Sequence, residues 1–127
     1  MKRLVGNKFG VSINKSSIKD GSGISRINLL TINQFSEFLK AVHKKQDLEL
    51  IKSIMACPGE DCTLNKRFKD IQGLYTKTGH LHNTTNLVGY FYDTNNELHS
   101  FVIMCNNYYG SHQPYQQLQE KIIRLFK

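Results

Sequence analysis

The 127-residue chain has no long apolar run. No stretch approaches the roughly 20 consecutive apolar residues that a membrane-spanning helix needs. Residues 1–6 include two basic residues, Lys2 and Arg3, but no apolar segment of the kind found in signal peptides follows them. Internal repeats and low-complexity segments are also absent. These absences predict no membrane span, and an export signal, if the protein is exported, would lie outside these residues.

Acidic residues are few, with 10 against 17 basic residues and a formal net charge of +7. This excess would suit a nucleic acid or an anionic surface as a partner. However, no run exceeds two consecutive basic residues. Dispersed charge favours a solvated surface, so we predict no nucleic-acid partner and keep a small basic nucleic-acid binder as the weaker alternative.

The three cysteines cannot all pair within the chain. Cys57 and Cys62 are close enough to form a bridge or to contribute to a metal site. A structural zinc site usually needs four ligands in two close pairs, and His80 and His82 do not complete such a set. We therefore predict free thiols and no metal. The other histidines considered are predicted to be surface residues: His43, His99 and His112.

Helical patterns dominate the first half. Residues 1–10 are typical of the end of a helix that Gly10 terminates, and residues 11–15 alternate weakly as in a short strand. Thr31 and Gln34 form a capping box for a helix that runs to about residue 45.

A second, shorter helix is predicted to follow, with Asp47 as its cap. Its inward-facing residues would be Leu48, Ile51 and Ile54.

The second half changes to strand periodicity. Strands are predicted at residues 71–77, ending at Gly79, and at residues 86–92 and 98–105, with a turn at residues 93–96. Short connections favour antiparallel pairing in sequence order. A closing helix at residues 113–127 has Leu118, Ile122, Leu125 and Phe126 as its apolar positions. The fold class is therefore α+β: a three-stranded antiparallel meander with N-terminal helices and a C-terminal helix.

Lys77-Thr78-Gly79 lies at the end of a predicted strand, beside a turn. Serine acyl-transferases of the penicillin-binding class use a lysine-threonine-glycine strand as one wall of the active site. The edge of such a strand pairs with an extended peptide. The lysine supplies positive charge, the threonine hydroxyl meets the terminal carboxylate of the substrate, and the glycine permits close approach.

Three further motifs surround this tripeptide. They are Asp20-Gly21-Ser22-Gly23-Ile24-Ser25-Arg26-x-Asn28-Leu29, Gly59-x-Asp61-x-Thr63-Leu64 and Asn86-Leu87-x-Gly89-Tyr90. With Lys77-Thr78-Gly79-x-Leu81 they follow the order and approximate spacing of the D-alanyl-D-alanine carboxypeptidase/endopeptidase family, the class C low-molecular-mass penicillin-binding proteins. Residues 20 to about 107 resemble the C-terminal part of that family.

The resemblance implies a partial penicillin-binding fold and serine-type hydrolysis of the D-alanyl-D-alanine bond of peptidoglycan peptides, without a cofactor. Lys77, Thr78, Gly79 and the amide of His80 would bind and polarise the substrate. In the family, the amide at the His80 position helps to form the oxyanion hole. The implied compartment is the bacterial periplasm or cell surface, and β-lactams would be ligands.

Other motif residues have two interpretations. Ile24 and Leu81 fall near the substrate pocket of the family, although burial in a core would explain either residue. Asp20, Ser22 and Arg26 would be either substrate contacts or turn and packing residues.

The family places its nucleophile motif Ser-x-x-Lys far upstream of the segment at residues 20–29. Ser12 and Ser16 begin Ser-x-x-Lys matches here, but they run into the turn at residues 20–23. The chemistry needs the serine at the start of a buried helix, so that the lysine one turn later faces the hydroxyl. We therefore predict that neither serine is a nucleophile and that the 127 residues are the C-terminal portion of a penicillin-binding domain.

The alternative function is a non-catalytic binding or interaction module derived from the same fold. Without the nucleophile segment, strand residues would remain uncovered, and an apolar patch with an open sheet edge predicts self-association as a homodimer. We predict that the remaining elements cannot bury all of five strand side chains at once. These are Leu74, Leu87, Tyr90, Val102 and Met104.

Overall fold

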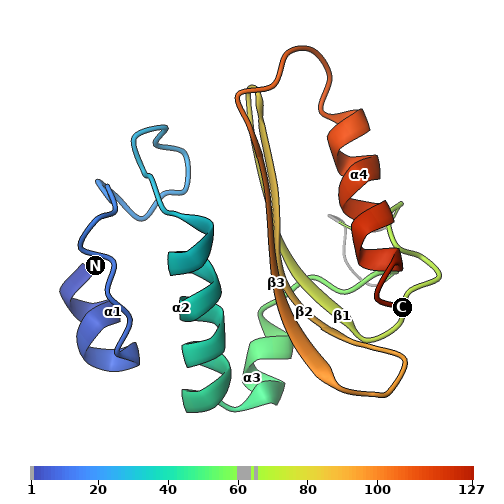
Figure 1. Cartoon of the computed structure of the whole chain (residues 1–127), viewed down its shortest axis with the longest axis horizontal. Helices are drawn as coiled ribbons and strands as arrows, with labels where there is room; N and C mark the ends of the chain where they lie inside the picture. The colour runs from blue at the N-terminus through green and yellow to red at the C-terminus, as the bar shows by residue number, and fades with distance from the viewer. Residues whose placement is uncertain (1, 60–63, 65) are drawn as a thin grey trace. The chain divides into compact units, whose positions relative to one another are not determined.

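A computed structural model describes residues 2–59, 64 and 66–127 (Figure 1). The chain divides into two compact units, residues 1–51 and residues 52–127. Within the described ranges, every helix is too short or too polar to cross a bilayer.

Two helices form most of the first unit. Helix α1 (Lys2–Phe9) ends where Gly10 adopts a φ of 71° and donates its N–H to the Gly6 carbonyl, as predicted. Helix α2 (Ile32–Lys45) carries the predicted capping box, because the Thr31 hydroxyl accepts the Gln34 N–H. The rings of Phe9 and Phe38 pack edge to face with centroids 5.2 Å apart, which joins α1 to α2.

The strand predicted at residues 11–15 is wrong. Val11 and Ile13 are buried, but these residues pair with no strand in the described structure. The chain turns instead, since both the N–H and the hydroxyl of Ser16 donate to the Ile13 carbonyl. Alternating burial in an irregular segment therefore produced the strand-like pattern.

Helix α3 (Leu48–Ser53) begins as predicted, because Asp47 accepts the N–H of Glu49 at 3.1 Å. Ile51 is buried and Leu48 is half-buried. Ile54 was predicted to face inward, which is wrong: it follows the end of the helix and is 71% exposed.

The second unit contains the predicted sheet. Its strands are β1 (Leu74–Leu81), β2 (Thr84–Tyr92) and β3 (Leu98–Asn106), antiparallel in the order β1-β2-β3. The sequential meander is therefore confirmed. Strand β1 begins at Leu74 rather than residue 71, and it continues through Gly79, where it was predicted to stop. Gly79 stays in the ladder opposite Asn86, and the reversal comes later, at Asn83 with a φ of 58°.

Helix α4 (Gln113–Arg124) covers one face of the sheet, called here the α4 face (Figure 1). The core on this face consists of Leu64, Phe68, Ile71, Leu74, Leu87, Phe91 and Ile123.

The predicted buried stripe of α4 is wrong. Leu118, Leu125 and Phe126 are exposed, Ile122 is half-buried, and the buried residues are Gln119 and Ile123. A polar network explains this rotation. Gln119 donates to the Thr85 carbonyl at 3.1 Å and accepts from Arg67, whose side chain also pairs with Glu120 at 2.8 Å.

Gly89 is required by the packing of β2 against β1. A Cβ atom at this position would lie 2.0 Å from the carbonyl oxygen of Tyr75 and 2.9 Å from the Cα of Thr76. Both are backbone atoms, so no side-chain movement would relieve the clash. Close approach of the two strands therefore explains the glycine of the Asn86-Leu87-x-Gly89 motif.

Candidate active site

The lysine-threonine-glycine segment lies on an edge strand. Strand β1 pairs with β2 on one side. On its other side, called here the outer edge, Thr76 exchanges two hydrogen bonds of 2.9 Å with Ala56. Beyond Thr76, no described strand pairs with the outer edge of β1. The segment after Thr76 therefore presents its outer backbone groups at an edge that no described strand covers.

The Ala56 bridge determines which backbone groups point outward. In an antiparallel ladder, successive residues direct their N–H and C=O to opposite edges. Since Thr76 bonds outward to Ala56, Thr78 and His80 also direct their N–H and C=O to the outer edge. Lys77 and Gly79 direct theirs to β2. The free edge thus presents the amide of His80, the group that the sequence motif singled out.

Lys77 and Thr78 provide charge and a hydroxyl beside this edge. Lys77 is exposed, and its Nζ donates to the carbonyl oxygen of Thr78 at 2.8 Å. Thr78 is half-buried, and alternation along the strand puts it on the α4 face with Leu74. An ammonium group and a hydroxyl next to free amides can bind a carboxylate and stabilise an oxyanion.

Gly79 has no structural need for glycine within the described residues. Its φ is not positive, and a Cβ atom there would meet only the Asn86 Cβ, at 4.0 Å. This contrasts with Gly89, where the neighbouring backbone excludes any side chain. The open space at Gly79 is therefore available to a ligand on the strand.

His80 is exposed, and its ring packs against that of His112 with a centroid separation of 4.5 Å and an interplanar angle of 64°. His112 is the N-cap residue of α4, where its side chain makes no capping hydrogen bond. His112 was predicted to be a surface residue, and its contact with His80 was not predicted. Pro114 marks the start of the helix, but no local signal indicates that this helix end meets β1.

The two predicted pocket residues differ in setting. Leu81 ends β1 and is half-buried, one residue after His80. Ile24 belongs to the first unit, in the loop between α1 and α2, and is 71% exposed. Core burial therefore does not explain Ile24.

The loop that carries Ile24 is held by hydrogen bonds to Asp20. Its Oδ1 accepts from the N–H and hydroxyl of Ser22, at 3.1 and 2.8 Å, and from the Asn28 amide at 3.2 Å. These bonds, chiefly that from the Ser22 hydroxyl, lower the pKa of Asp20. The Asn28 oxygen in turn accepts the N–H of Lys19 at 2.7 Å. Asp20, Ser22 and Asn28 thus build the turn itself.

The remaining motifs are in part structural. Leu64 and Leu87 are fully buried, and Asn86 accepts the N–H of Cys105 at 3.2 Å. Asp61 and Thr63, predicted as motif residues, lie outside the described residues, as does Cys62.

Ser12 and Ser16 are not on a helix. No described residue between α1 and α2 is helical. Ser16 is buried, and its hydroxyl is engaged by the carbonyl of Ile13. The geometry that a Ser-x-x-Lys nucleophile needs is therefore not present at either serine.

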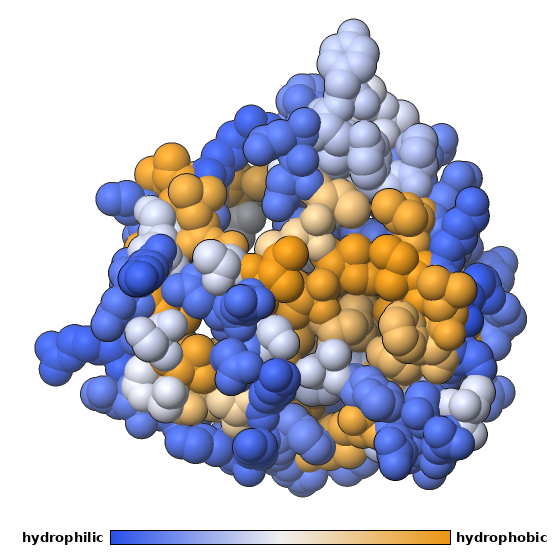
Figure 2. Space-filling model, viewed as in Figure 1, coloured by the Kyte–Doolittle hydropathy of each residue, from blue (hydrophilic) through white to orange (hydrophobic). Residues whose placement is uncertain are grey.

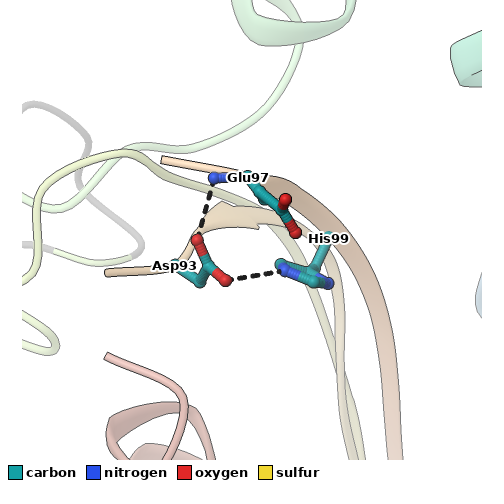
Figure 3. Close-up of side chains that lie close together, drawn as sticks. All are labelled: Asp93, Glu97 and His99. Carbon is teal, nitrogen blue, oxygen red and sulfur yellow. Dashed lines mark hydrogen bonds and ion pairs between the residues drawn. The ribbon is translucent and has the colours of Figure 1, made fainter. Parts of the chain in front are cut away.

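Asp93, Glu97 and His99 gather at the β2–β3 turn (Figure 3), with potential ligand atoms within 4.8 Å of one another. Asp93 accepts the N–H groups of Asn95 and Glu97 at 2.9 and 2.8 Å, and its other oxygen contacts His99 at 3.1 Å. The hydrogen bond from Glu97 is the main cause that lowers the pKa of Asp93. These bonds account for the cluster as a stabilised turn. Cys105 is a free thiol, as predicted.

Known proteins share this sequence and fold. Residues 1–125 match the D-Ala-D-Ala carboxypeptidase 3 (S13) family. A D-alanyl-D-alanine carboxypeptidase, DacB of Haemophilus influenzae, is 29% identical over 106 residues, which cover 80% of this chain and 22% of that protein.

Two crystal structures of penicillin-binding protein 4 (DacB) from H. influenzae have a similar fold. The structure with a bound β-lactam has a TM-score of 0.87 and 24% identity, and covers 99% of this chain and 32% of that protein. The other has a TM-score of 0.83 and 25% identity, over 95% of this chain and 30% of that protein. The chain thus spans less than a third of the solved relatives, and the partial penicillin-binding fold predicted from its motifs is confirmed.

Proposed function

The chain belongs to the D-Ala-D-Ala carboxypeptidase 3 (S13) family, and on that premise we propose that it supplies the peptide-binding strand of a serine-type D-alanyl-D-alanine carboxypeptidase or endopeptidase. The substrate would be the peptide of peptidoglycan, in the bacterial periplasm or at the cell surface. The observation that supports this most directly is the free outer edge of β1, which begins immediately after the Ala56–Thr76 bridge.

An extended peptide can join this edge as an additional strand. The outward N–H and C=O groups of Thr78 and His80 would pair with the peptide backbone. Lys77 and the Thr78 hydroxyl would bind its terminal carboxylate, since charge-assisted hydrogen bonds are stronger than neutral ones. The open position at Gly79 lets the peptide approach the strand closely. Leu81 would contact the peptide beyond His80, and we assign Ile24 a substrate contact as well.

The chemistry requires a serine outside the groups described above. Attack of that hydroxyl on the scissile carbonyl would form a C–O bond and place negative charge on the carbonyl oxygen. The outward amide of His80 is suited to stabilise this charge, because a backbone N–H needs no reorganisation during the reaction. Collapse of the intermediate would break the C–N bond and release D-alanine, whose amine takes up the proton that the serine hydroxyl loses. Water would then attack the acyl-enzyme, break the C–O bond to the serine and restore its hydroxyl. We infer that the nucleophile comes from sequence equivalent to the remainder of the longer relatives.

The alternative function is a non-catalytic peptide-binding module. The same free edge supports it, because binding needs only the strand and the carboxylate-binding groups. Both proposed functions require peptide binding at β1. They differ in whether a nucleophilic serine is also present at the site.

Binding of a synthetic peptide that ends in D-alanyl-D-alanine tests the common requirement. Thr78→Val removes one hydrogen bond to a charged group, so we expect affinity to fall about tenfold or more. Thr94→Val, in the β2–β3 turn, is the matched control and should bind like the wild type. Isothermal titration with a peptide ending in L-alanyl-L-alanine measures selectivity. Equal binding by Thr78→Val and the wild type would contradict the proposed role of β1.

We also infer a homodimer through β3. This strand has a described neighbour only on its β2 side, and Figure 2 shows an apolar area over β3 and α4. The groove there is lined by apolar residues, including Phe101, Ile103, Ile122 and Phe126. Of the five strand residues predicted not to be all buried, Leu74, Leu87 and Tyr90 are buried, whereas Val102 and Met104 are half-buried.

An antiparallel strand edge is complementary to a second copy of itself across a two-fold axis. Sedimentation at micromolar concentration should therefore show a dimer. Phe126→Glu, at a side chain that is 58% exposed, should shift it to monomer, and Leu4→Glu, at 64% exposure in the first unit, should not. A wild-type monomer throughout this range would contradict the dimer.

A further inference from the structure

Two imidazoles meet at the end of the lysine-threonine-glycine strand. His80 follows Gly79 on β1, and His112 caps α4, 32 residues later in the sequence. Their ring centroids are 4.5 Å apart. Within the described part of the chain, no hydrogen bond engages either ring. Their nitrogens are therefore available to a ligand.

The separation of the rings matches that of two histidines that share one metal ion. Imidazole nitrogens bind zinc at roughly 2.0–2.1 Å, which puts the centroids of two rings on one ion roughly 4.5–5.2 Å apart for bond angles between about 90° and 109°. The observed 4.5 Å lies at the lower end of this range. The rings now pack edge to face at an interplanar angle of 64°, so binding one ion requires the two side chains to rotate.

Both ligands come from anchored backbone. His80 lies in the β1–β2 ladder opposite Thr85, and His112 accepts the N–H groups of Tyr115 and Gln116 in the first turn of α4. Because the backbone is anchored, ion binding restricts only the two side chains, which limits the loss of conformational freedom. His80 is exposed and His112 is half-buried, so an ion and its remaining water ligands can enter from solvent.

We propose that His80 and His112 form a two-histidine site for a divalent transition-metal ion of the zinc or nickel class. Neutral imidazole suits these ions, whereas magnesium and calcium prefer oxygen ligands. The bound ion links the free end of β1 to the start of α4, beside the outward amide of His80. Water molecules complete its coordination.

The cluster at Asp93, Glu97 and His99 serves as an internal control (Figure 3). There, Asp93 already accepts two backbone N–H groups and contacts His99. A metal ion at that cluster must displace the His99 contact, whereas an ion at His80 and His112 displaces no hydrogen bond to a described residue.

Titration with ZnCl₂, observed through the histidine ring signals in NMR spectra, tests the proposal. Each signal is assigned by its disappearance when that histidine is substituted. Because only histidine rings are observed, zinc that binds to cysteine thiols does not contribute to these signals. We expect the His80 and His112 signals to shift together with one shared dissociation constant. His99 should respond only at concentrations at least tenfold higher. In His112→Gln, the response of His80 should require at least tenfold more zinc, and His99→Gln should leave the His80 and His112 response unchanged.

A second measurement separates loss of the site from loss of the fold. A ligand that binds only the folded state raises the melting temperature. Zinc should raise it in the wild type and in His99→Gln, with a smaller rise in His112→Gln and in His80→Ser. Backbone NMR spectra without zinc should show all variants folded, because neither ring makes a hydrogen bond that the described fold uses. Separate dissociation constants for His80 and His112, or an undiminished His80 response in His112→Gln, would overturn the proposal.

Discussion

Each of the two compact units is stabilised internally by a different kind of contact. The first, residues 1–51, has a long loop organised by polar groups around Asp20, and it exposes several apolar side chains, among them Ile24, Ile27 and Leu29. The second, residues 52–127, has a contiguous apolar core between the sheet and α4. The comparison shows that a motif can be maintained by local hydrogen bonds or by tertiary packing, and that substitutions should affect the two units differently.

The largest expected contrast is chemical. The first unit carries both Ser-x-x-Lys matches, and the second carries the lysine-threonine-glycine strand. We expect the 127-residue chain to form no stable adduct with a labelled penicillin, because Ser12 and Ser16 lie outside any helix and the Ser16 hydroxyl is bound to the Ile13 carbonyl. Intact-mass measurement after incubation checks this. An adduct of one molecule per chain, mapped to either serine, would contradict it.

Glycine substitutions should sharpen the structural comparison. Gly89→Ala places a methyl group 2.0 Å from the Tyr75 carbonyl in the second unit, and we expect it to cost about 4 kcal/mol or more and to unfold the sheet. Gly23→Ala, in the first unit, meets no atom within 4 Å but keeps a φ of 75°. It should cost only about 1 kcal/mol.

Chemical denaturation followed by circular dichroism measures both glycine variants. If Gly89→Ala proved no more destabilising than Gly23→Ala, strand packing at Gly89 would not be the reason for that glycine.

Alkaline pH should affect the second unit through Tyr90, whose burial raises its pKa to about 12. The pKa of a tyrosine in the unfolded chain is about 10. Because the folded-state pKa is higher, the contribution of Tyr90 to stability is fully present below that unfolded-state pKa. This contribution is lost as pH rises towards 12. Tyr90→Phe should therefore show a smaller decline in stability over this window. Tyr109→Phe is the control, since Tyr109 is 98% exposed. Identical pH profiles for the wild type and Tyr90→Phe would contradict this prediction.

Acidic pH should produce the smallest effect, in the loop around Asp20. The pKa of this carboxyl is lowered, chiefly by the hydrogen bond from the Ser22 hydroxyl. Its contribution is therefore present above the unfolded value, about 3.9, and is lost as pH falls through the folded value. NMR shifts of the Ser22 and Ile24 amides should change in that window. In Asp20→Asn these shifts should no longer follow pH, and persistence of the transition would assign it to another group.

Much of the fold could be predicted because its signals are local. The capping box at Thr31 and Gln34, the helix end at Gly10 and the β2–β3 turn each depend on residues a few positions apart. Errors arose where burial, rather than backbone preference, shaped the pattern. Val11 and Ile13 are buried without a strand partner, and the polar contacts of Gln119 rotate α4 away from its apparent apolar stripe.

The candidate site divides in the same way. By itself, the sequence determined the motif residues, their order and the strand that carries Lys77, because side-chain types and short spacings encode them. Only the tertiary structure decided that Ala56 bonds to Thr76, which directs the amides of Thr78 and His80 outward. It also decided that His112 meets His80. Such contacts depend on which surfaces the packed elements bring together, and residues 20 or more positions apart carry no local signal of their meeting.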